Sequence, residues 1–66
     1  MRVTVNGTPH DLPAGTTLTA LLADLGLLVG SVVVEHNGTA LLRGEVQAAE
    51  LADGDVLELV RAVAGG

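Results

Sequence analysis

The candidate reactive residues of this chain lie at its end, where Ala62-Val63-Ala64 leads to Gly65-Gly66. A Gly-Gly end has no reactive side chain, so the group it offers is the α-carboxylate of Gly66. Because glycine lacks a Cβ, Gly65 and Gly66 can enter a narrow channel that is closed to other residues. Fully extended, five residues span roughly 16 Å. Such a tail could carry a carboxylate into a partner's active site, although chain ends are also commonly poorly ordered and tolerant of sequence change.

Composition limits what the rest of the chain can do. It has 66 residues with three arginines, no lysine and eight carboxylates, for a formal net charge of −5. This balance argues against nucleic-acid binding through a basic patch and favours basic protein partners. Without lysine, the chain cannot accept an isopeptide bond on a lysine side chain. It could take part in such chemistry only by donating its own carboxylate.

The length predicts one small domain. The chain has no cysteine and no aromatic residue, so its core must be built from leucine, valine and alanine without disulfides. A domain of this size buries only about 60% of the surface that its unfolded chain exposes. The absence of cysteine is compatible with the cytoplasm, where we expect the protein. The apolar run at residues 18–29 is too short to span a membrane.

Two histidines and two neighbouring aspartates are the other candidates for chemistry. His10 falls in a predicted edge strand, where we expect it to be exposed, and His36 has no histidine or cysteine nearby. Asp53 and Asp55 flank Gly54, but aspartate and glycine are common turn formers, and no complete calcium-loop pattern surrounds them. The sequence therefore predicts a turn here and no metal site.

The first residues predict a hairpin. Val3 and Val5 alternate with polar residues, which indicates a half-buried strand. Asn6-Gly7 favours a two-residue turn because both residues tolerate positive φ. The returning strand, residues 8–12, contains Pro9, which lacks an amide donor and therefore predicts an edge strand.

The next segment predicts the main helix. Residues 13–15 form a turn, and Thr16 or Thr17 can cap the helix by accepting a hydrogen bond from a first-turn amide. Gly26 is a left-handed stop signal, which predicts a helix over residues 18–25. Its apolar face is needed for the core and comprises Leu18, Leu21, Leu22 and Leu25.

The second half of the chain predicts strands separated by turns. Residues 31–35 contain three valines, which favour a strand, with Val33 and Glu35 on one side. A turn at residues 36–38 and a short strand at residues 40–43 follow. We expect residues 44–51 to be a loop that can include one helical turn around residues 46–50, and residues 52–55 to form a tight turn.

The last strand, residues 56–61, runs almost to the Gly-Gly end. Alternation places Leu57 and Leu59 inward, which leaves Val56, Glu58 and Val60 on the other face. Ala62 continues that row, beside Val63. Single exposed valines are common, but their position beside the tail predicts a docking surface for a partner that handles it. The candidate docking residues are Glu58, Val60, Ala62 and Val63.

These elements predict a small α+β domain over residues 1–61 and an extended, flexible tail over residues 62–66. Hairpin strands flank one main helix, which covers one face of a mixed sheet of four to five strands. The first and last strands both alternate cleanly and lack proline. We therefore expect them to be neighbours at the centre of the sheet.

The whole chain resembles the ThiS family of sulfur carriers in thiamine biosynthesis. The resemblance rests on several short segments in the same order and at the same spacing. The clearest is Val-Val-Val-Glu-His-Asn-Gly at residues 32–38, and Arg43 follows its glycine by five residues. Family members often have proline where this chain has Leu42. The other segments are residues 3–7, residues 15–25, Asp53-Gly-Asp and the terminal Val63-Ala-Gly-Gly.

The resemblance implies the ubiquitin-like β-grasp fold and a carrier that is acted on by enzymes and is not itself one. A ThiF-type enzyme would use ATP to adenylate the Gly66 carboxylate, and sulfur drawn from cysteine by a desulfurase would displace AMP. The resulting thiocarboxylate would donate its sulfur to a ThiG-type thiazole synthase. In this scheme Gly65 and Ala64 give access, and the carrier provides no catalytic side chain, metal or bound cofactor.

The residues leave other functions open. Carriers for molybdopterin or cysteine synthesis share the fold and tail, and a ubiquitin-like protein modifier shares the activation chemistry. A modifier would yield lysine conjugates with a Gly-Gly remnant. A plain interaction domain with an inert tail predicts that deletion of Gly66 has no effect.

Overall fold

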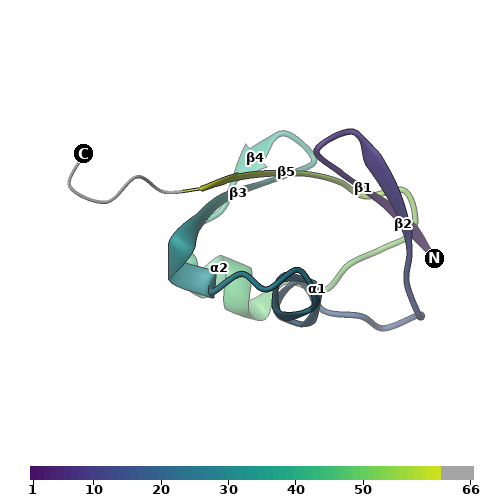
Figure 1. Cartoon of the computed structure of the whole chain (residues 1–66), viewed down its shortest axis with the longest axis horizontal. Helices are drawn as coiled ribbons and strands as arrows, with labels where there is room; N and C mark the ends of the chain where they lie inside the picture. The colour runs from purple at the N-terminus through teal and green to yellow at the C-terminus, as the bar shows by residue number, and fades with distance from the viewer. Residues whose placement is uncertain (62–66) are drawn as a thin grey trace.

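The computed structural model describes residues 1–61, which form one five-stranded mixed sheet with two helices on a single face (Figure 1). The strand order is β2-β1-β5-β3-β4. This arrangement confirms the predicted α+β fold with one main helix. The elements are β1 (Arg2–Val5), β2 (Thr8–Asp11), α1 (Leu18–Asp24), the 3-10 helix η1 (Val29–Ser31), β3 (Val32–His36), β4 (Thr39–Ala40), α2 (Arg43–Ala48) and β5 (Val56–Arg61).

Two Asn-Gly turns close the two hairpins of the sheet. Asn6 has φ 48° and Gly7 has φ 82°, and the turn between β3 and β4 repeats these values at Asn37 and Gly38, with 49° and 86°. Positive φ at both central positions is the geometry that matches the twist of the flanking strands. β2, which carries Pro9, is an edge strand as predicted.

The first and last strands are parallel neighbours at the centre of the sheet, as predicted, with Thr4 opposite Val56. Beyond this short register the side chain of Asn6 continues the pairing. Its Oδ1 accepts from the amide of Leu59 at 2.8 Å, and its Nδ2 donates to the carbonyl of Leu59 at 3.2 Å. The last part of β5 is therefore held to β1 by a side chain in place of a backbone ladder.

Helix α1 starts and stops where its local sequence specifies. Thr17 is the N-cap residue, and its hydroxyl accepts from the amide of Ala20 at 3.1 Å. The helix ends at Asp24, one residue before the predicted end, and Gly26 takes φ 75° just beyond it. The predicted cap is thus confirmed at Thr17.

The segment after β4 differs from the prediction. The strand expected at residues 40–43 is only Thr39–Ala40, and Arg43 begins α2, which replaces most of the predicted loop. The carboxylate of Glu45 accepts from the amide of Leu42 at 2.8 Å, which satisfies a donor at the helix start. Val46 is 3% exposed and anchors the helix in the core.

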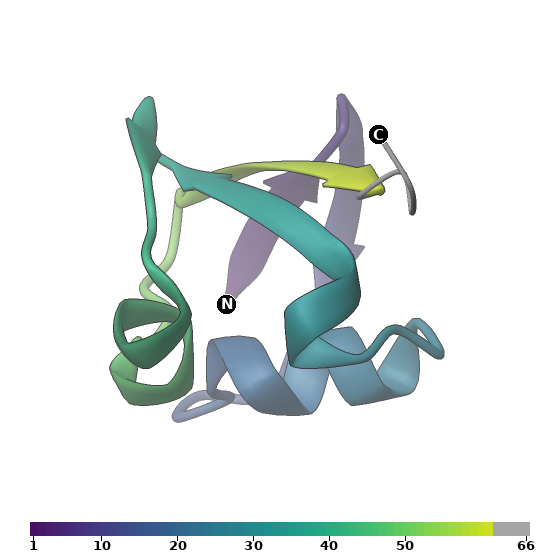
Figure 2. The same cartoon turned by 90° about the vertical axis from the view of Figure 1, so that its left-hand side faces the viewer.

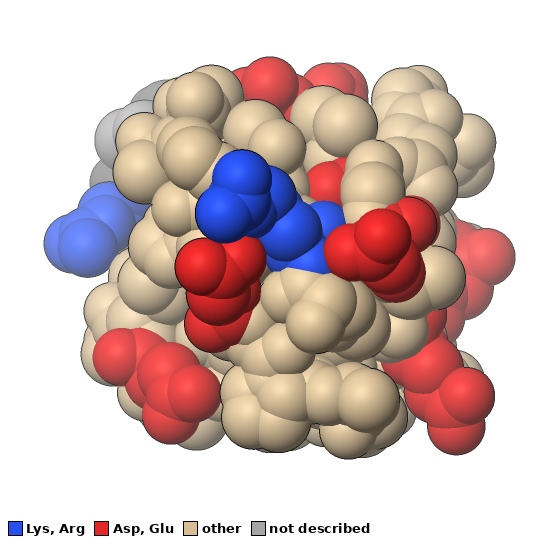
Figure 3. Space-filling view, turned by 90° about the vertical axis from the view of Figure 1, so that its right-hand side faces the viewer, with Lys and Arg blue, Asp and Glu red and all other residues tan. Residues whose placement is uncertain are grey.

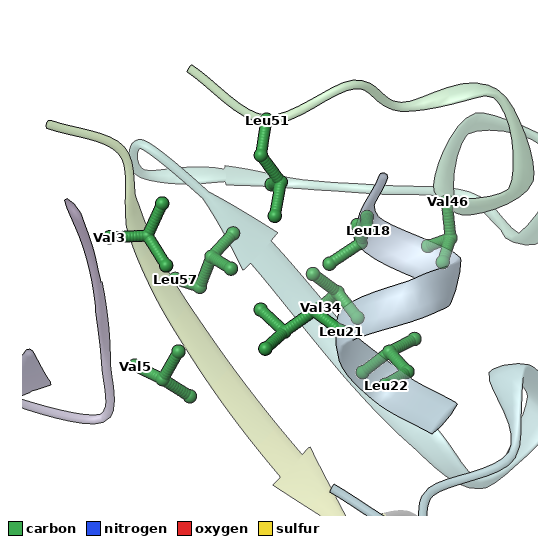
Figure 4. Packing of buried hydrophobic residues seen from close by; sticks show 9 residues of the cluster. All are labelled: Val3, Val5, Leu18, Leu21, Leu22, Val34, Val46, Leu51 and Leu57. Carbon is green, nitrogen blue, oxygen red and sulfur yellow. The ribbon is translucent and has the colours of Figure 1, made fainter. Parts of the chain in front are cut away.

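The core lies between the sheet and the helices and is entirely aliphatic (Figures 2 and 4). Leu57 of β5 is fully buried, whereas Leu59 is only partly buried against the core. Both inward positions of β5 agree with the predicted alternation. The buried cluster consists of Val3, Val5, Leu18, Leu21, Leu22, Val34, Val46, Leu51 and Leu57.

Candidate functional site

The sheet face opposite the helices carries the predicted docking residues that the structure describes. Val60 and Glu58 are exposed on this face, as the alternation of β5 predicts. Val33 of β3 lies directly opposite Val60. Their exposed fractions are 50% and 60%, respectively. We call Val33 and Val60 the valine pair; it lies near the end of β5 that leads to residues 62–66.

Two carboxylates lie next to the valine pair on the same face. Glu35 of β3 is directly opposite Glu58 of β5. Like charges in this arrangement destabilise a sheet, and among residues 1–61 neither glutamate has a cation within ion-pair distance. A basic side chain from a partner would relieve this repulsion. The face therefore offers an apolar pair beside a concentrated negative charge.

Sequence reasoning missed Val33 and Glu35 as site residues. The alternation of β3 had placed them on one side of the strand, which the structure confirms. What the sequence did not provide was the register that sets Val33 against Val60 and Glu35 against Glu58. That register is a contact between residues more than 20 positions apart, so no local pattern could have indicated it.

At the β1–β2 end, positive and negative charges are already paired within the chain. Arg2 Nε donates to Asp11 Oδ1 at 3.0 Å, and the Arg2 amide donates to Asp53 at 2.7 Å. Figure 3 views this end and shows blue atoms between red ones. The hydrogen bond from Arg2 and its charge lower the pKa of Asp11 below its ordinary value. This pairing is solvent-exposed, so we assign it no docking role.

A second polar cluster lies at the end of β3 that is away from the valine pair. It joins the turn after β3 to the turn before β5. The Asp55 carboxylate accepts from His36 Nε2 at 2.9 Å, from Asn37 Nδ2 at 3.0 Å and from the Ala52 amide at 2.8 Å. Burial acts to raise the pKa of Asp55, but these hydrogen bonds and the charge of His36 outweigh it and lower the pKa. The cluster is a structural connection between turns.

The predicted turn at residues 52–55 is confirmed, with Gly54 at φ 88°. The sequence had offered no companion for His36, and the structure supplies Asp55. In the part of the chain that the structure describes, no group of three or more His, Cys, Asp or Glu side chains could hold a metal ion. His10 is partly buried, which corrects its predicted exposure, because it pairs with Val3 and shares the helix-facing side of the sheet.

The predicted tail lies outside the described residues. Gly66, the proposed reacting position, and Gly65, Ala64, Val63 and Ala62 are therefore not placed by the structure. No helix within residues 1–61 is long and apolar enough to cross a membrane.

Comparison with known proteins places these features in a family. The ThiS family matches residues 3–66. The sulfur carrier protein ThiS of Thermus thermophilus is 41% identical over 64 residues, which cover 97% of this chain and 98% of that protein. A thiazole synthase of Magnetococcus marinus is 41% identical over 66 residues, all of this chain but 20% of the synthase. This chain thus spans about a fifth of the length of that relative.

A solved structure extends the similarity to the fold. The crystal structure of the thiamine biosynthesis protein ThiS from Geobacter metallireducens matches with a TM-score of 0.82 and 35% sequence identity, and the match covers 100% of both chains. This match confirms the predicted β-grasp fold, and the family match and the near full-length relative show the family. The chain is a member of the ThiS family.

Proposed function

We propose that this chain is a sulfur carrier for thiamine biosynthesis whose Gly66 carboxylate is converted to a thiocarboxylate. The observation that carries the proposal is the exposed valine pair, in which Val60 lies on β5, the strand that leads to the Gly-Gly end, and Val33 lies opposite it on β3. Membership of the ThiS family supports a carrier in place of an enzyme. The same membership favours thiamine over molybdopterin or cysteine synthesis.

The chemistry needs activation because a free carboxylate is a poor acyl donor. The Gly66 carboxylate is ionised at neutral pH, with an ordinary terminal pKa of about 3.3–3.7. Attack of this carboxylate on ATP forms an acyl adenylate and releases pyrophosphate. A sulfur nucleophile at the oxidation level of hydrosulfide then forms a C–S bond, the C–O bond to AMP breaks, and AMP leaves. The product is a thiocarboxylate on Gly66.

The carrier's part in this reaction is presentation. Gly65 gives the chain a narrow backbone at the reacting end, and Ala64 adds little bulk before it. ATP belongs to the ThiF-type activating enzyme, and the sulfur comes from cysteine through a desulfurase, which holds it as a persulfide. A thiol reductant attacks the inner sulfur of this persulfide, forms a disulfide and releases the outer sulfur at the oxidation level of hydrosulfide. No side chain of the carrier is needed as an acid, base or metal ligand.

Docking would use the valine pair and the glutamates beside it. A partner that places an apolar recess over Val33 and Val60 removes exposed apolar surface from water. A basic side chain between Glu35 and Glu58 removes the repulsion between them. Ala62 and Val63, the other predicted docking residues, would continue the contact toward the tail.

The ThiG-type thiazole synthase is the proposed acceptor of the sulfur. Its partnership is supported by two relatives named thiazole synthase, from Magnetococcus marinus and Paramagnetospirillum magneticum, which are 41% and 33% identical to this chain over 66 residues. In each, the similar region makes up 20% of the protein. A carrier-like region within a synthase polypeptide suits a direct transfer between the two.

The test is the intact mass of the chain after incubation with ATP, a ThiF-type enzyme and hydrosulfide. We expect a shift equal to replacement of one oxygen by sulfur, located on Gly66 by fragmentation. The matched control is the chain that lacks Gly66, which should not shift. An unshifted mass with an enzyme shown to be active on another carrier would contradict the proposal.

A further inference from the structure

An apolar groove with one cation lies at the same end of the sheet as the valine pair, but on its helix-facing side. Its volume is about 320 Å³. Its apolar walls come from the segment that follows α1, from β3 and from β5. The groove is lined by, among others, Leu25, Leu27, Val32, Leu59, Asn6 and Arg61.

The two polar residues of the groove differ in what they can offer a partner. The side-chain amide of Asn6 already makes two hydrogen bonds to the backbone of Leu59, one as donor and one as acceptor. Arg61, opposite Val32 in the register, has no carboxylate within ion-pair distance among residues 1–61. Arg61 is therefore the charged group that the groove presents.

The walls are accessible to a partner side chain. Leu25 is 39% exposed, although it follows directly on the buried face of α1. Leu59 is only partly buried, in contrast to the fully buried Leu57 two residues earlier on the same side of β5. The core is thus incomplete at this end, where an added apolar side chain would remove further surface from water.

We propose that this groove receives an apolar side chain flanked by a carboxylate, both provided by the thiazole synthase that takes the tail. The proposal rests on the function proposed above. The apolar walls select the apolar side chain, and the guanidinium of Arg61 pairs with carboxylates in a bidentate geometry. Arg61 lines the groove and directly precedes Ala62 in the sequence, so the tail begins beside the groove.

The charges on the two faces make this contact directional. Glu35 and Glu58 on the outer face would attract a basic partner surface, whereas Arg61 on the groove side would attract an acidic one. A synthase that contacts both faces with opposite charges can bind the end of β5 in one orientation only. That orientation would fix the direction in which Gly66 enters the synthase.

The test uses two variants and two matched controls in the full chain. Leu25→Gln removes an apolar wall, and its control is Leu28→Gln, at a leucine that is 77% exposed and outside the groove. Arg61→Ala lowers the net charge by one, and its control is Gln47→Glu, an exposed position on α2 with the same charge change. Binding to a ThiG-type synthase is measured by titration calorimetry, and thermal unfolding confirms that each variant is folded.

We expect Leu25→Gln and Arg61→Ala each to weaken binding to the synthase by about fivefold or more, with both controls within about twofold of the parent chain. Arg61→Ala should also reduce the dependence of binding on salt. Unchanged binding of the two groove variants to the synthase would overturn the proposal. Equal losses of affinity in the controls would also overturn it, as would variants that lose affinity for a ThiF-type enzyme but not for the synthase. Tighter binding of Arg61→Ala would show that the chain's own carboxylate occupies the groove, and would also overturn it.

A separate readout distinguishes this proposal from the proposed function. The parent chain and every variant are assayed for the mass shift on Gly66 with hydrosulfide. If the parent chain never gains sulfur, the carrier function fails regardless of the binding data. If it gains sulfur and binds the synthase while the groove variants bind equally well, the groove proposal alone fails.

Discussion

The connection between turns at Asp55 allows a sharp test of what stabilises this fold. Asp55 is 7% exposed and accepts three hydrogen bonds, from Ala52, His36 and Asn37. The Asp55→Ala substitution removes all three and leaves the donors without their acceptor. Because these bonds join the turn before β5 to the turn after β3, their loss should destabilise the whole sheet and not only one loop.

The size of the effect follows from the bonds. A hydrogen bond to a charged group contributes about 1.5–3 kcal/mol, but the three share one acceptor, and the side chain of His36 is 25% exposed and can turn to water. We therefore expect Asp55→Ala to cost about 3 kcal/mol and not the full sum. A chain of this length has a total stability of about 3–10 kcal/mol. The melting temperature should fall by about 12–24 °C.

The pH dependence provides an independent check. Because the pKa of Asp55 is lowered on folding from its ordinary value of 3.8, the charged carboxylate stabilises the fold above that value. The contribution is lost as pH falls through the lower pKa of the folded state. Asp55→Asn should remove this dependence in the acid range and cost less than Asp55→Ala, since an amide oxygen still accepts from Ala52.

Denaturant titrations between about pH 2 and pH 7 measure both effects. Asp11→Asn is the control, because Asp11 also has a lowered pKa but lies in an exposed pair. A cost below about 1 kcal/mol for Asp55→Ala would show that these hydrogen bonds do not stabilise the sheet. So would an acid-range slope that Asp55→Asn leaves unchanged and Asp11→Asn removes.

Three further predictions concern the helices and the outer face. Thr17→Ala, which removes the hydrogen bond to the Ala20 amide, should lower the free energy of unfolding by about 1 kcal/mol. Leu22→Ala in the core should lower it by about 2–5 kcal/mol. Denaturant titration measures both, and a larger loss for Thr17→Ala than for Leu22→Ala would contradict the importance of core packing. Val60→Asp should weaken binding to the activating enzyme or the synthase while the melting temperature stays within a few degrees, because Val60 is 60% exposed; unchanged affinity in a titration would refute its docking role.

Local sequence determined the parts of the fold that could be predicted. Asn6-Gly7 and Asn37-Gly38 need positive φ at both positions, and few other residue pairs adopt it as readily. The cap at Thr17 depends on a hydroxyl three residues before the amide it binds. β5 runs over residues 56–61, as its alternation predicts. In each case the deciding interaction lies within a few residues of the chain.

The features that the sequence did not predict depend on contacts between distant residues. Helix α2 is short and contains Gly44, so its local preference is weak. It forms because Val46 reaches the core and because the Leu18 amide donates to Ala49 beyond its end, at 3.2 Å. The bond between His36 and Asp55 spans 19 positions in the same way.

The same difference between local features and contacts of distant residues applies to the candidate site. The exposed parity of Val60 could be predicted from the sequence because it depends on alternation alone, whereas Gly66 as the reacting position stays a prediction. The valine pair, the opposed glutamates and the groove at Arg61 could not, because each combines β5 with residues from another element. The proposed reacting group thus depends on chain order alone, while the surfaces that would select a partner come from the fold.

The way β5 is held limits how a partner can use the tail. β5 pairs with β3 as far as Arg61, opposite Val32, and the side chain of Asn6 holds Leu59 from the other side. Arg61, the last residue before the tail, is therefore held in the central strand of the sheet, and five fully extended residues reach roughly 16 Å. An enzyme that contacts the valine pair must have its reacting atoms within that reach. The depth of the partner's channel and the position of its docking surface are thus set together by five residues of chain.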